Sequence, residues 1–399
     1  MPKQIYLDNA ATTAVLPEVV QAMLPYFTET YGNPSSLYAV GQDAQAAISD
    51  ARERIAAHLN ANAAEIYFTG SGTEADNWAL KATMEAYQSK GRHLITSAIE
   101  HHAILHSAEW LEKNGCEVTY LPVDADGLVN PADLQAALRP DTVLVSVIMA
   151  NNEIGTIQPI AELAAITHAN GSLFHTDAVQ AMAHLPIDVQ AMGIDMLSAS
   201  AHKFHGPKGV GLLYIKKGLK LRSFIHGGAQ ERKRRAGTEN VPGIMAMAAA
   251  LDLVMPSLAE RAEKARALRD HLIERVLAEV PYSRLNGHLT QRLPNNANFS
   301  LQFIEGESIL MMLAAQGVMA SSGSACTSGS LDPSHVLLAI GLPHEIAHGS
   351  LRLTLGDDTT IEDIDYTVEV IKTVVEQLRS MSPLYEDYQK GKKPISAIR

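Results

Sequence analysis

A lysine at the end of a short apolar run is the strongest chemical signal in this sequence. Residues 196–197 read Met-Leu, residues 200–203 read Ser-Ala-His-Lys, and a glycine-rich turn follows at 206–211. An amine at the end of a buried strand can form a Schiff base with a bound aldehyde, which is how pyridoxal 5'-phosphate (PLP) enzymes hold their cofactor. A lone lysine in such a place more often just reaches water. The hypothesis that Lys203 is a Schiff-base lysine therefore depends on further residues.

An aspartate at the end of the preceding apolar run supports this hypothesis. Residues 174–180 read Phe-His-Thr-Asp-Ala-Val-Gln, and open α/β sheets bind ligands at the carboxyl ends of their strands. PLP needs a carboxylate beside its pyridine nitrogen, because the protonated ring withdraws electrons from the substrate. Asp177 suits that place and Gln180 suits a hydrogen bond to the ring hydroxyl. A helix N-cap is an equally common use of such an aspartate.

A glycine-rich junction offers a site for the cofactor's phosphate. Residues 70–77 read Gly-Ser-Gly-Thr-Glu-Ala-Asp-Asn and join a predicted strand to a predicted helix. Backbone N–H groups and a threonine hydroxyl at a helix start bind anions. The spacing matches neither the Walker A nor the dinucleotide-binding pattern. With Lys203 present, a phosphate site is favoured over an ordinary capped helix.

A histidine pair follows another predicted strand, where residues 100–103 read Glu-His-His-Ala. An imidazole in this place is able to stack on the pyridine ring and to transfer protons near neutral pH. Two adjacent histidines also suggest a metal, but no further ligands at metal-binding spacing accompany them. No metal site is predicted.

A cysteine lies within a run of small polar residues at 320–330. Such a segment is typical of an exposed loop, whereas free cysteines are among the most buried residue types. Exposure favours a reactive thiol, whose nucleophilic form is the thiolate. Cys326 is therefore a candidate nucleophile. Cys116, which precedes a β-rich run, is interpreted as a packing residue.

Composition narrows the class of protein. The chain has 399 residues, of which 46% are hydrophobic, enough for a large core and for two domains. Its 32 basic and 44 acidic residues give a net charge of −12, which argues against nucleic acid or an anionic membrane as a general partner. Two cysteines suggest no disulfide framework. The longest apolar run, at 244–251, is far shorter than the roughly 20 residues that span a bilayer, so we expect a soluble cytoplasmic protein.

Short β-rich runs alternate with helical patterns over the first two thirds of the chain. The predicted strands are 66–69, 93–97, 117–122, 142–149, 172–175, 195–198 and 210–215. The predicted helices are 41–59, 73–88, 103–114, 131–138 and 160–169. This alternation implies crossover connections and an α/β fold with a mainly parallel seven-stranded sheet covered by helices.

A long helical stretch at 242–279, bent near Pro256, is expected to carry the domain boundary. Residues 16–257 would form a large PLP-binding domain. Residues 1–15 and 258–399 would form a smaller α+β domain that carries the cysteine loop. Its expected elements are strands at 297–303 and 351–355 and helices at 307–315 and 361–378.

Four motifs taken together resemble the cysteine desulfurases, which are class V aminotransferase-like, fold-type I PLP enzymes. The motifs are 177–180 (Asp-Ala-Val-Gln), 200–203 (Ser-Ala-His-Lys), 235–238 (Arg-Ala-Gly-Thr) and 322–328 (Ser-Gly-Ser-Ala-Cys-Thr-Ser), and the resemblance runs from residues 6–13 to 382–383. The cysteine segment is similar to that of the long-loop branch, which supplies iron–sulfur cluster assembly. Residues 175–180 and 237–240 look closer to the nitrogen-fixation type than to the housekeeping type. Ala229 stands where many relatives have a third glycine.

The resemblance implies a role for each matching residue. Lys203 would form the Schiff base, Asp177 would bind the ring nitrogen, Gln180 would bind the ring hydroxyl, and His101 would stack on the ring and assist proton transfer. The remaining expected cofactor contacts are Gly72, Thr73, Asn152, Ser200, His202 and Thr238. Thr238 would reach the cofactor of the partner subunit, which implies a homodimer.

The resemblance also implies the substrate and the product. Asn152 and Arg352 would bind the carboxylate of L-cysteine, for which a guanidinium fork is well shaped. Cys326 would take the sulfur as a persulfide, leave alanine, and pass the sulfur to an iron–sulfur scaffold protein or another acceptor. In that complex Cys326 could act as a transient iron–sulfur ligand.

Three alternatives remain open from the sequence. An aminotransferase on the same fold needs Lys203, Asp177 and Arg352 but has no use for Cys326. A non-catalytic assembly protein that retains the fold would have no need of these residues. Selenocysteine lyase activity differs only in the substrate.

Overall fold

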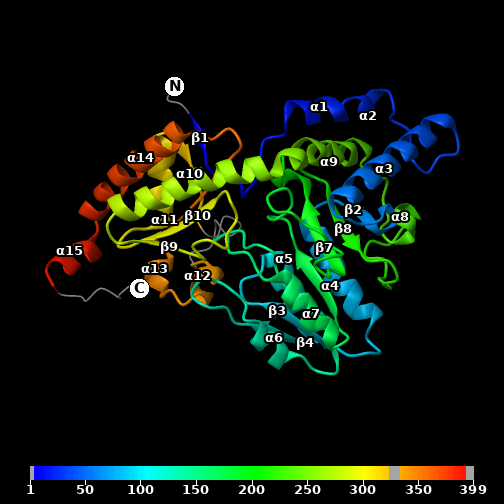
Figure 1. The fold of residues 1–399 in the computed structure, drawn as a ribbon, viewed down its shortest axis with the longest axis horizontal. Coiled ribbons are helices and arrows are strands. Elements are labelled where there is room, and N and C mark those ends of the chain that lie inside the picture. Colours follow the sequence, from blue (N-terminus) through cyan, green and yellow to red (C-terminus); the bar gives the residue numbers. More distant parts are fainter. Residues whose placement is uncertain (1–3, 323–332, 392–399) are drawn as a thin grey trace.

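A seven-stranded sheet forms the centre of the larger part of the protein (Figure 1). The computed structural model describes residues 4–322 and 333–391. The strands of this sheet are β2 (Ile66–Thr69), β3 (His93–Ser97), β4 (Glu117–Leu121), β5 (Thr142–Ser146), β6 (Leu173–Asp177), β7 (Met196–Ser200) and β8 (Gly211–Ile215). Their order is β2-β8-β7-β6-β5-β3-β4, and only β8 runs antiparallel to its neighbours. The predicted mainly parallel sheet of seven strands is confirmed.

Helices cover both faces of this sheet, because successive side chains of its buried strands point to opposite faces. In β3, Leu94 packs with one apolar cluster and Ile95 with another. The helices on the Leu94 face are α4 (Gly72–Ala86) and α5 (His102–Lys113). The helices on the opposite face include α3 (Ala39–His58), α7 (Ile160–Ala169) and α9 (Val241–Val254), and α6 (Pro131–Ala137) packs beside α7. The crossovers leave the carboxyl ends of β3, β5, β6 and β7 at one edge of the sheet.

A smaller antiparallel sheet forms the second part of the molecule. Its strands are β9 (Ser283–Leu285), β10 (Asn296–Leu301) and β12 (Ser350–Thr354), and a separate parallel pair joins β1 (Ile5–Tyr6) to β11 (Val318–Met319). The helices α10 (Leu258–Glu279), α11 (Gly306–Ala315) and α14 (Ile361–Ser380) pack on this sheet around a core that includes Leu7, Leu272 and Phe299. The predicted domain limits, 16–257 against 1–15 with 258–399, stay a prediction.

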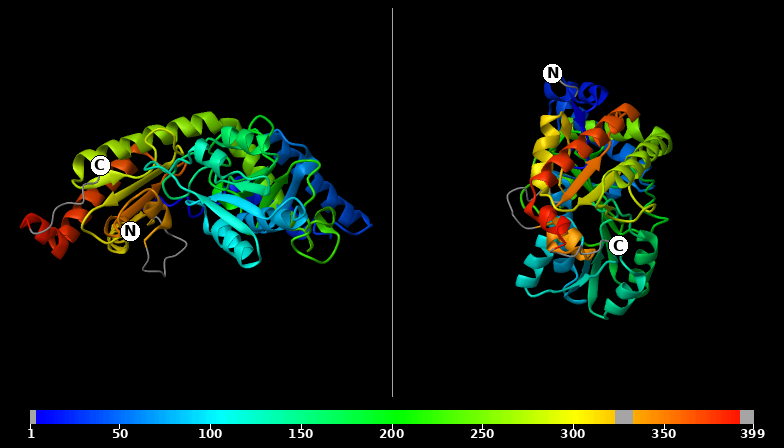
Figure 2. Two further views of the ribbon diagram at one scale, coloured as in Figure 1. Left: turned by 90° about the horizontal axis from the view of Figure 1, so that it is seen from below. Right: turned by 90° about the vertical axis from the view of Figure 1, so that its left-hand side faces the viewer.

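The predicted bend of the long helix near Pro256 is present. The helix α9 ends at Val254, a 3-10 turn (Met255–Ser257) follows, and α10 then runs from the large sheet to the small one (Figures 1 and 2). Proline lacks the N–H that an uninterrupted helix would need there. Within the described residues, Val241–Glu279 is one helical stretch that is long and apolar enough to cross a membrane. In the protein, 56% of its most apolar part is buried. The apolar segment is thus longer than the sequence suggested, and its burial is typical of a core helix.

Several short elements were not predicted. They are α1 (Pro17–Met23), α2 (Pro25–Thr28), α8 (Gln230–Lys233), α12 (His335–Ala339), α13 (His344–Ala347), α15 (Pro383–Gln389) and the 3-10 turns Ala63–Glu65 and Ala201–Lys203. Segments of three to seven residues complete at most two helical turns. They are too short for an apolar period of 3.6 residues to stand out in the sequence.

Candidate active site

The amino end of α4 forms one wall of a cavity at the carboxyl edge of the large sheet. Ser71 caps this helix, and its side chain accepts a hydrogen bond from the Glu74 N–H at 3.1 Å. A Cβ atom on Gly72 would lie only 2.6 Å from Cγ2 of Val179. Glycine therefore lets the helix start lie against the turn after β6, with its unpaired N–H groups available to an anion.

Asp177 is the last residue of β6 and is 3% exposed. Its Oδ1 accepts a hydrogen bond from the Val179 N–H at 2.9 Å. Burial raises the pKa of this carboxyl group to about 6, while the Val179 N–H and the Lys203 charge oppose the rise. A cationic group next to Asp177 would stabilise the carboxylate further.

Lys203 lies on the 3-10 turn that follows β7, and the amino-terminal segment holds its amine. The Nζ atom donates to the carbonyl oxygens of Ala10 at 2.5 Å and Ala11 at 2.8 Å. The Gln180 amide donates to the same Ala10 carbonyl at 2.9 Å. The Nδ1 atom of His202 lies 3.1 Å from the Thr12 hydroxyl. Sequence reasoning missed this segment, because backbone carbonyl groups carry no side-chain signal.

His101 caps α5, and its Nδ1 accepts a hydrogen bond from the Ala103 N–H at 3.1 Å. Burial and, to a smaller extent, the charge of Lys203 lower the pKa of His101 to about 4. His101 is therefore neutral near pH 7, with Nδ1 engaged by the backbone. A neutral imidazole is able to accept a proton in this cavity and return it.

Arg352, on strand β12 of the small sheet, lines the same cavity. Its Nη1 donates to the Asn152 carbonyl at 3.0 Å, and its Nη2 forms an ion pair with Asp8 Oδ1 at 2.9 Å. Its Nε is buried and has no hydrogen-bond partner among the described residues. A buried N–H without a partner is costly, so this edge of the guanidinium is suited to a carboxylate ligand.

The cavity has a volume of about 330 Å³ and joins most of the predicted site residues. Its lining consists of Ala10, Ala11, Ser71, Gly72, Thr73, Asp76, His101, Ile148, Asn152, Asp177, Val179, Gln180, Ser200, His202, Lys203 and Arg352. Thr238 is not among them and lines a separate cavity with Arg235 and Asn240. Cys326 lies outside the described residues.

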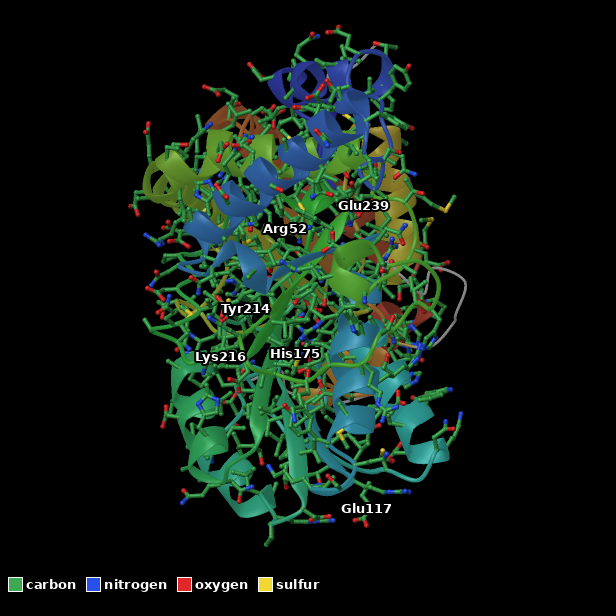
Figure 3. The ribbon with its side chains drawn as sticks, turned by 90° about the vertical axis from the view of Figure 1, so that its right-hand side faces the viewer. Arg52, Glu117, His175, Tyr214, Lys216 and Glu239 are labelled. Atoms are coloured by element: carbon green, nitrogen blue, oxygen red, sulfur yellow. The ribbon has the colours of Figure 1, made fainter. Side chains whose placement is uncertain are left out.

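Asp76 is the lining residue that sequence reasoning should have considered and did not. Asp76 is 1% exposed. One carboxylate oxygen of Asp76, one of Asp177 and one ring nitrogen of His101 all lie within 4.8 Å of one another. Burial raises the pKa of Asp76 well above its usual value, and the nearby Asp177 carboxyl raises it further. Behind it, His175 in the central sheet hydrogen-bonds Ser146 at 2.8 Å and Ser198 at 3.0 Å (Figure 3). The signal was present in the motif at 70–77, where Asp76 lies one helical turn after Gly72.

The residues of this cavity fit PLP. Gly72 lies at the start of α4, where the phosphate of the cofactor would bind with Thr73, Ser200 and His202. Asp177 is a buried carboxylate in the same cavity lining, and Lys203 supplies the amine. An anion site, a buried carboxylate and a lysine amine are the three groups that this cofactor requires.

Replacing Asp177 is expected to weaken PLP binding. In Asp177→Ala the ring nitrogen would lose one charge-assisted hydrogen bond, which is worth about 1.5–3 kcal/mol and corresponds to roughly a 10- to 150-fold higher Kd. Equilibrium titration of the apoprotein with PLP measures this change. Asp188→Ala is the matched control, because Asp188 also accepts a backbone N–H bond, from Gln190 at 3.0 Å, but lies outside the cavity. Equal Kd values for all three proteins would show that another group holds the ring.

Glu100 is a fully buried carboxyl group behind His101. Its Oε1 accepts hydrogen bonds from the Ser97 hydroxyl at 2.5 Å and from the Ile148 N–H at 2.9 Å. Burial raises its pKa to about 8, against those two hydrogen bonds, and the Asp177 charge adds to the rise. Between the usual carboxyl pKa and 8, the folded protein therefore binds a proton that the unfolded chain has lost. The contribution of Glu100 to stability falls as the pH rises through this window.

Glu100→Gln is expected to remove this pH dependence. The amide keeps an oxygen for the Ser97 and Ile148 contacts and does not ionise. Relative to wild type, the variant should therefore gain thermal stability progressively from pH 5 to pH 8. Calorimetry of both proteins across this range measures the difference, with the exposed Glu109→Gln on α5 as control. A difference that is constant with pH would contradict the assignment.

Comparison with known proteins agrees with this geometry. The family model described as "Aminotransferase class-V" matches residues 5–367. A cysteine desulfurase IscS of Methanosarcina thermophila is 57% identical over 382 residues, which cover 96% of this chain and 94% of that protein. A cysteine desulfurase IscS of Clostridium botulinum is 55% identical over 395 residues, covering 98% of this chain and all of that one.

Solved structures give the same result. A structure titled "NIFS-LIKE PROTEIN" superimposes with a TM-score of 0.89 at 37% identity and covers 94% of this chain and 100% of its own. A structure titled "SspA in complex with cysteine" has a TM-score of 0.80 at 35% identity, with 89% of this chain and 100% of that chain covered. The chain belongs to the aminotransferase class-V family and, within it, to the cysteine desulfurases. The predicted family, fold type and enzyme class are confirmed.

Proposed function

We propose that this protein removes sulfur from L-cysteine with PLP as cofactor, giving L-alanine and a persulfide on Cys326. The observation that carries the proposal is the single cavity that joins Lys203, Asp177 and His101 with Arg352. Relatives that are more than half identical over nearly the whole chain bear the name cysteine desulfurase. When bound, PLP would supply an electron-accepting ring that stabilises negative charge on the substrate Cα.

The substrate's carboxylate would bind the free edge of Arg352 and the Asn152 side chain. Neither residue belongs to a strand of the large sheet. A hydrogen bond of 3.0 Å from Arg352 Nη1 to the Asn152 carbonyl oxygen joins them. This contact would orient the Cα–H bond of the substrate toward the Lys203 amine. The Ala10 and Ala11 carbonyl groups hold that amine in the cavity, so Lys203 is placed to accept the Cα proton.

His101 would provide the second proton-transfer group. Its lowered pKa of about 4 keeps it neutral at physiological pH, so it is able to accept a proton from the incoming thiol of the substrate. Its backbone contact with Ala103 fixes the ring. Among the described residues of the cavity, His101 and His202 are the two imidazoles, and His202 lies beside the phosphate-binding residues.

Cys326 would act as the sulfur acceptor. The Cys326 thiolate would form an S–S bond to the substrate's Sγ as the Cβ–Sγ bond breaks, and Cβ would keep the electron pair and take a proton to become the methyl group of alanine. The described chain stops after Ser322 and resumes at Pro333. Ser321 pairs with the Arg352 backbone, and the Ser334 hydroxyl bonds the Glu153 carboxylate at 2.5 Å. Cys326 is four residues from Ser322, a span of at most about 14 Å, so the thiol is within reach of the carboxylate-binding residues.

A homodimer would complete the site. Thr238 lies apart from the cavity, as a residue that serves a partner's cofactor would. A second cavity of about 520 Å³ adjoins Thr238 and is lined in part by Ser35, Arg52, Arg232 and Glu239. Figure 3 labels two of these residues, Arg52 and Glu239. In the stretch of chain around Ser35, large apolar side chains are exposed, namely Leu24, Phe27, Tyr31, Leu37 and Tyr38. Exposed apolar groups of this size favour a protein interface.

The proposed sulfur acceptors are an iron–sulfur scaffold protein or another sulfur carrier, and the proposed compartment is the cytoplasm. The relatives named cysteine desulfurase IscS support a sulfur-supplying role for this chain. A net charge of −12 continues to argue against nucleic acid as a general partner.

Incubation of the purified, PLP-loaded protein with L-cysteine tests the function. Alanine and, with a reductant, sulfide should appear in equal amounts, and the peptide that contains Cys326 should gain the mass of one sulfur atom. The Cys116 peptide should gain none. Amino-group exchange with a keto acid in the absence of sulfur release would instead establish the aminotransferase alternative.

A further inference from the structure

Asp8 is an acidic residue that the proposed reaction does not use, yet it contacts the residue proposed to bind the substrate. Its Oδ1 accepts from Arg352 Nη2 at 2.9 Å, and the two side chains are 19% and 3% exposed. The contact joins residues 344 positions apart in the chain. Asp8 is held in place because the Thr354 N–H donates to the Leu7 carbonyl at 2.7 Å and the Asn9 N–H to the Thr354 carbonyl at 3.3 Å.

This ion pair determines which edge of the guanidinium is available. Arginine has five N–H donors in a rigid plane. Asp8 takes one from Nη2, and the Asn152 carbonyl takes one from Nη1. The Nε–H is left buried and without a partner among the described residues. Asp8 and Asn152 together therefore prevent rotation of the Arg352 plane and leave its Nε edge for a ligand.

The same ion pair limits the positive charge of the site. Among the described residues that line the cavity, Lys203 and Arg352 are the two cationic side chains, because His101 and His202 each have a pKa lowered to about 4. Two carboxyl groups face Arg352. One is Asp8, and the other is Glu153, whose pKa of about 7 is raised by burial and lowered by the Ser334 hydroxyl and by Arg352. These carboxyl groups largely offset the positive charge of Arg352, so the site balances no more than one ligand carboxylate.

We propose that Asp8 is a positioning residue that makes this site selective for amino acids with a single anionic group. The proposal rests on the function proposed above, in which Arg352 binds the α-carboxylate. Asp8 holds the Nε edge of Arg352 toward that carboxylate. Its negative charge offsets that of Arg352, so the site does not balance a second anionic group on the side chain of a competing amino acid, as in L-aspartate.

Two variants separate the orienting role from the charge. Asp8→Asn keeps an oxygen for Nη2 and removes the charge, whereas Asp8→Ala removes both. Binding of L-alanine and of L-aspartate is measured by equilibrium titration of the cofactor absorbance, which requires no turnover. We expect the affinity for L-aspartate relative to L-alanine to rise by about fivefold or more in both variants, because the charge of Arg352 is then no longer offset by Asp8.

Steady-state kinetics with L-cysteine provide the second readout. Asp8→Ala should raise KM by about tenfold and change kcat by less than about threefold, because Asp8 contacts no reacting atom. Asp8→Asn should raise KM less. Tyr6→Phe is the matched control: the Tyr6 hydroxyl bonds the backbone oxygens of Asp8 and Thr12, forms no hydrogen bond with Arg352 among the described residues and is uncharged at neutral pH, so the KM and selectivity of this variant should match wild type.

An unchanged aspartate-to-alanine ratio in both Asp8 variants would overturn the proposal. A fall in kcat equal to the rise in KM, with unchanged selectivity, would equally overturn it, since that is the result of a merely structural role. Neither outcome bears on the proposed reaction. That reaction fails only if wild type releases no sulfur from L-cysteine.

Discussion

Lys203→Ala is expected to lower alanine release from L-cysteine by about a thousandfold or more. Loss of this amine removes both the covalent attachment of the cofactor and the group that is placed to accept the Cα proton. The Ala10 and Ala11 carbonyl groups, which bond Nζ at 2.5 and 2.8 Å, would lose this donor in the variant, and the Ala10 carbonyl would keep only the Gln180 amide. PLP should then be removable from the variant by gel filtration, because only non-covalent contacts retain it.

Borohydride reduction provides a readout that is independent of turnover. In wild type it should fix the mass of reduced PLP on the peptide that contains Lys203, and in the variant it should not. Lys208→Ala is the matched control, because Lys208 is an exposed lysine in the turn that follows. Wild-type turnover in Lys203→Ala, or reduced cofactor on another lysine, would show that the Schiff-base lysine has been assigned wrongly.

Cys326→Ala is expected to abolish sulfide release while it preserves the colour of the bound cofactor and the binding of L-cysteine. The substitution removes the sulfur acceptor and leaves every described residue of the cavity in place. Without a thiolate, no S–S bond to the substrate's Sγ can form. A substrate whose β-group leaves without a thiol, such as cysteine sulfinate supplied at a concentration high enough to offset its weaker binding, should still yield alanine. Sulfide assays and the persulfide mass on the Cys326 peptide measure the effect.

Cys116→Ala is the control for this prediction. Cys116 is half-buried and packs against the cluster that includes Trp78, and burial raises the pKa of its thiol, which makes it a poor nucleophile. This variant should desulfurate cysteine at the wild-type rate. If Cys326→Ala does so too, the sulfur does not pass through Cys326, and the aminotransferase alternative gains support.

Sequence by itself determined the sheet and the chemical groups at its edge. The strands β6 and β7 begin with two apolar residues and end in a polar one, and that local pattern places Asp177 and Ser200 at the carboxyl ends of parallel strands. Gly72 at a strand-to-helix junction was likewise readable as an anion site. These features depend on neighbours within a few residues, so no tertiary contact was needed to predict them.

Only the tertiary structure decided what surrounds those groups. The Ala10 and Ala11 carbonyl groups reach Lys203 from more than 190 positions away, and Asp8 reaches Arg352 from 344 positions away. Thr238 lies at a different cavity from the other predicted cofactor residues. Contacts of this kind depend on how the amino-terminal segment packs between the two sheets. Packing of this kind leaves no periodic signal in the chain, because each side chain meets its partner only after the whole fold has formed.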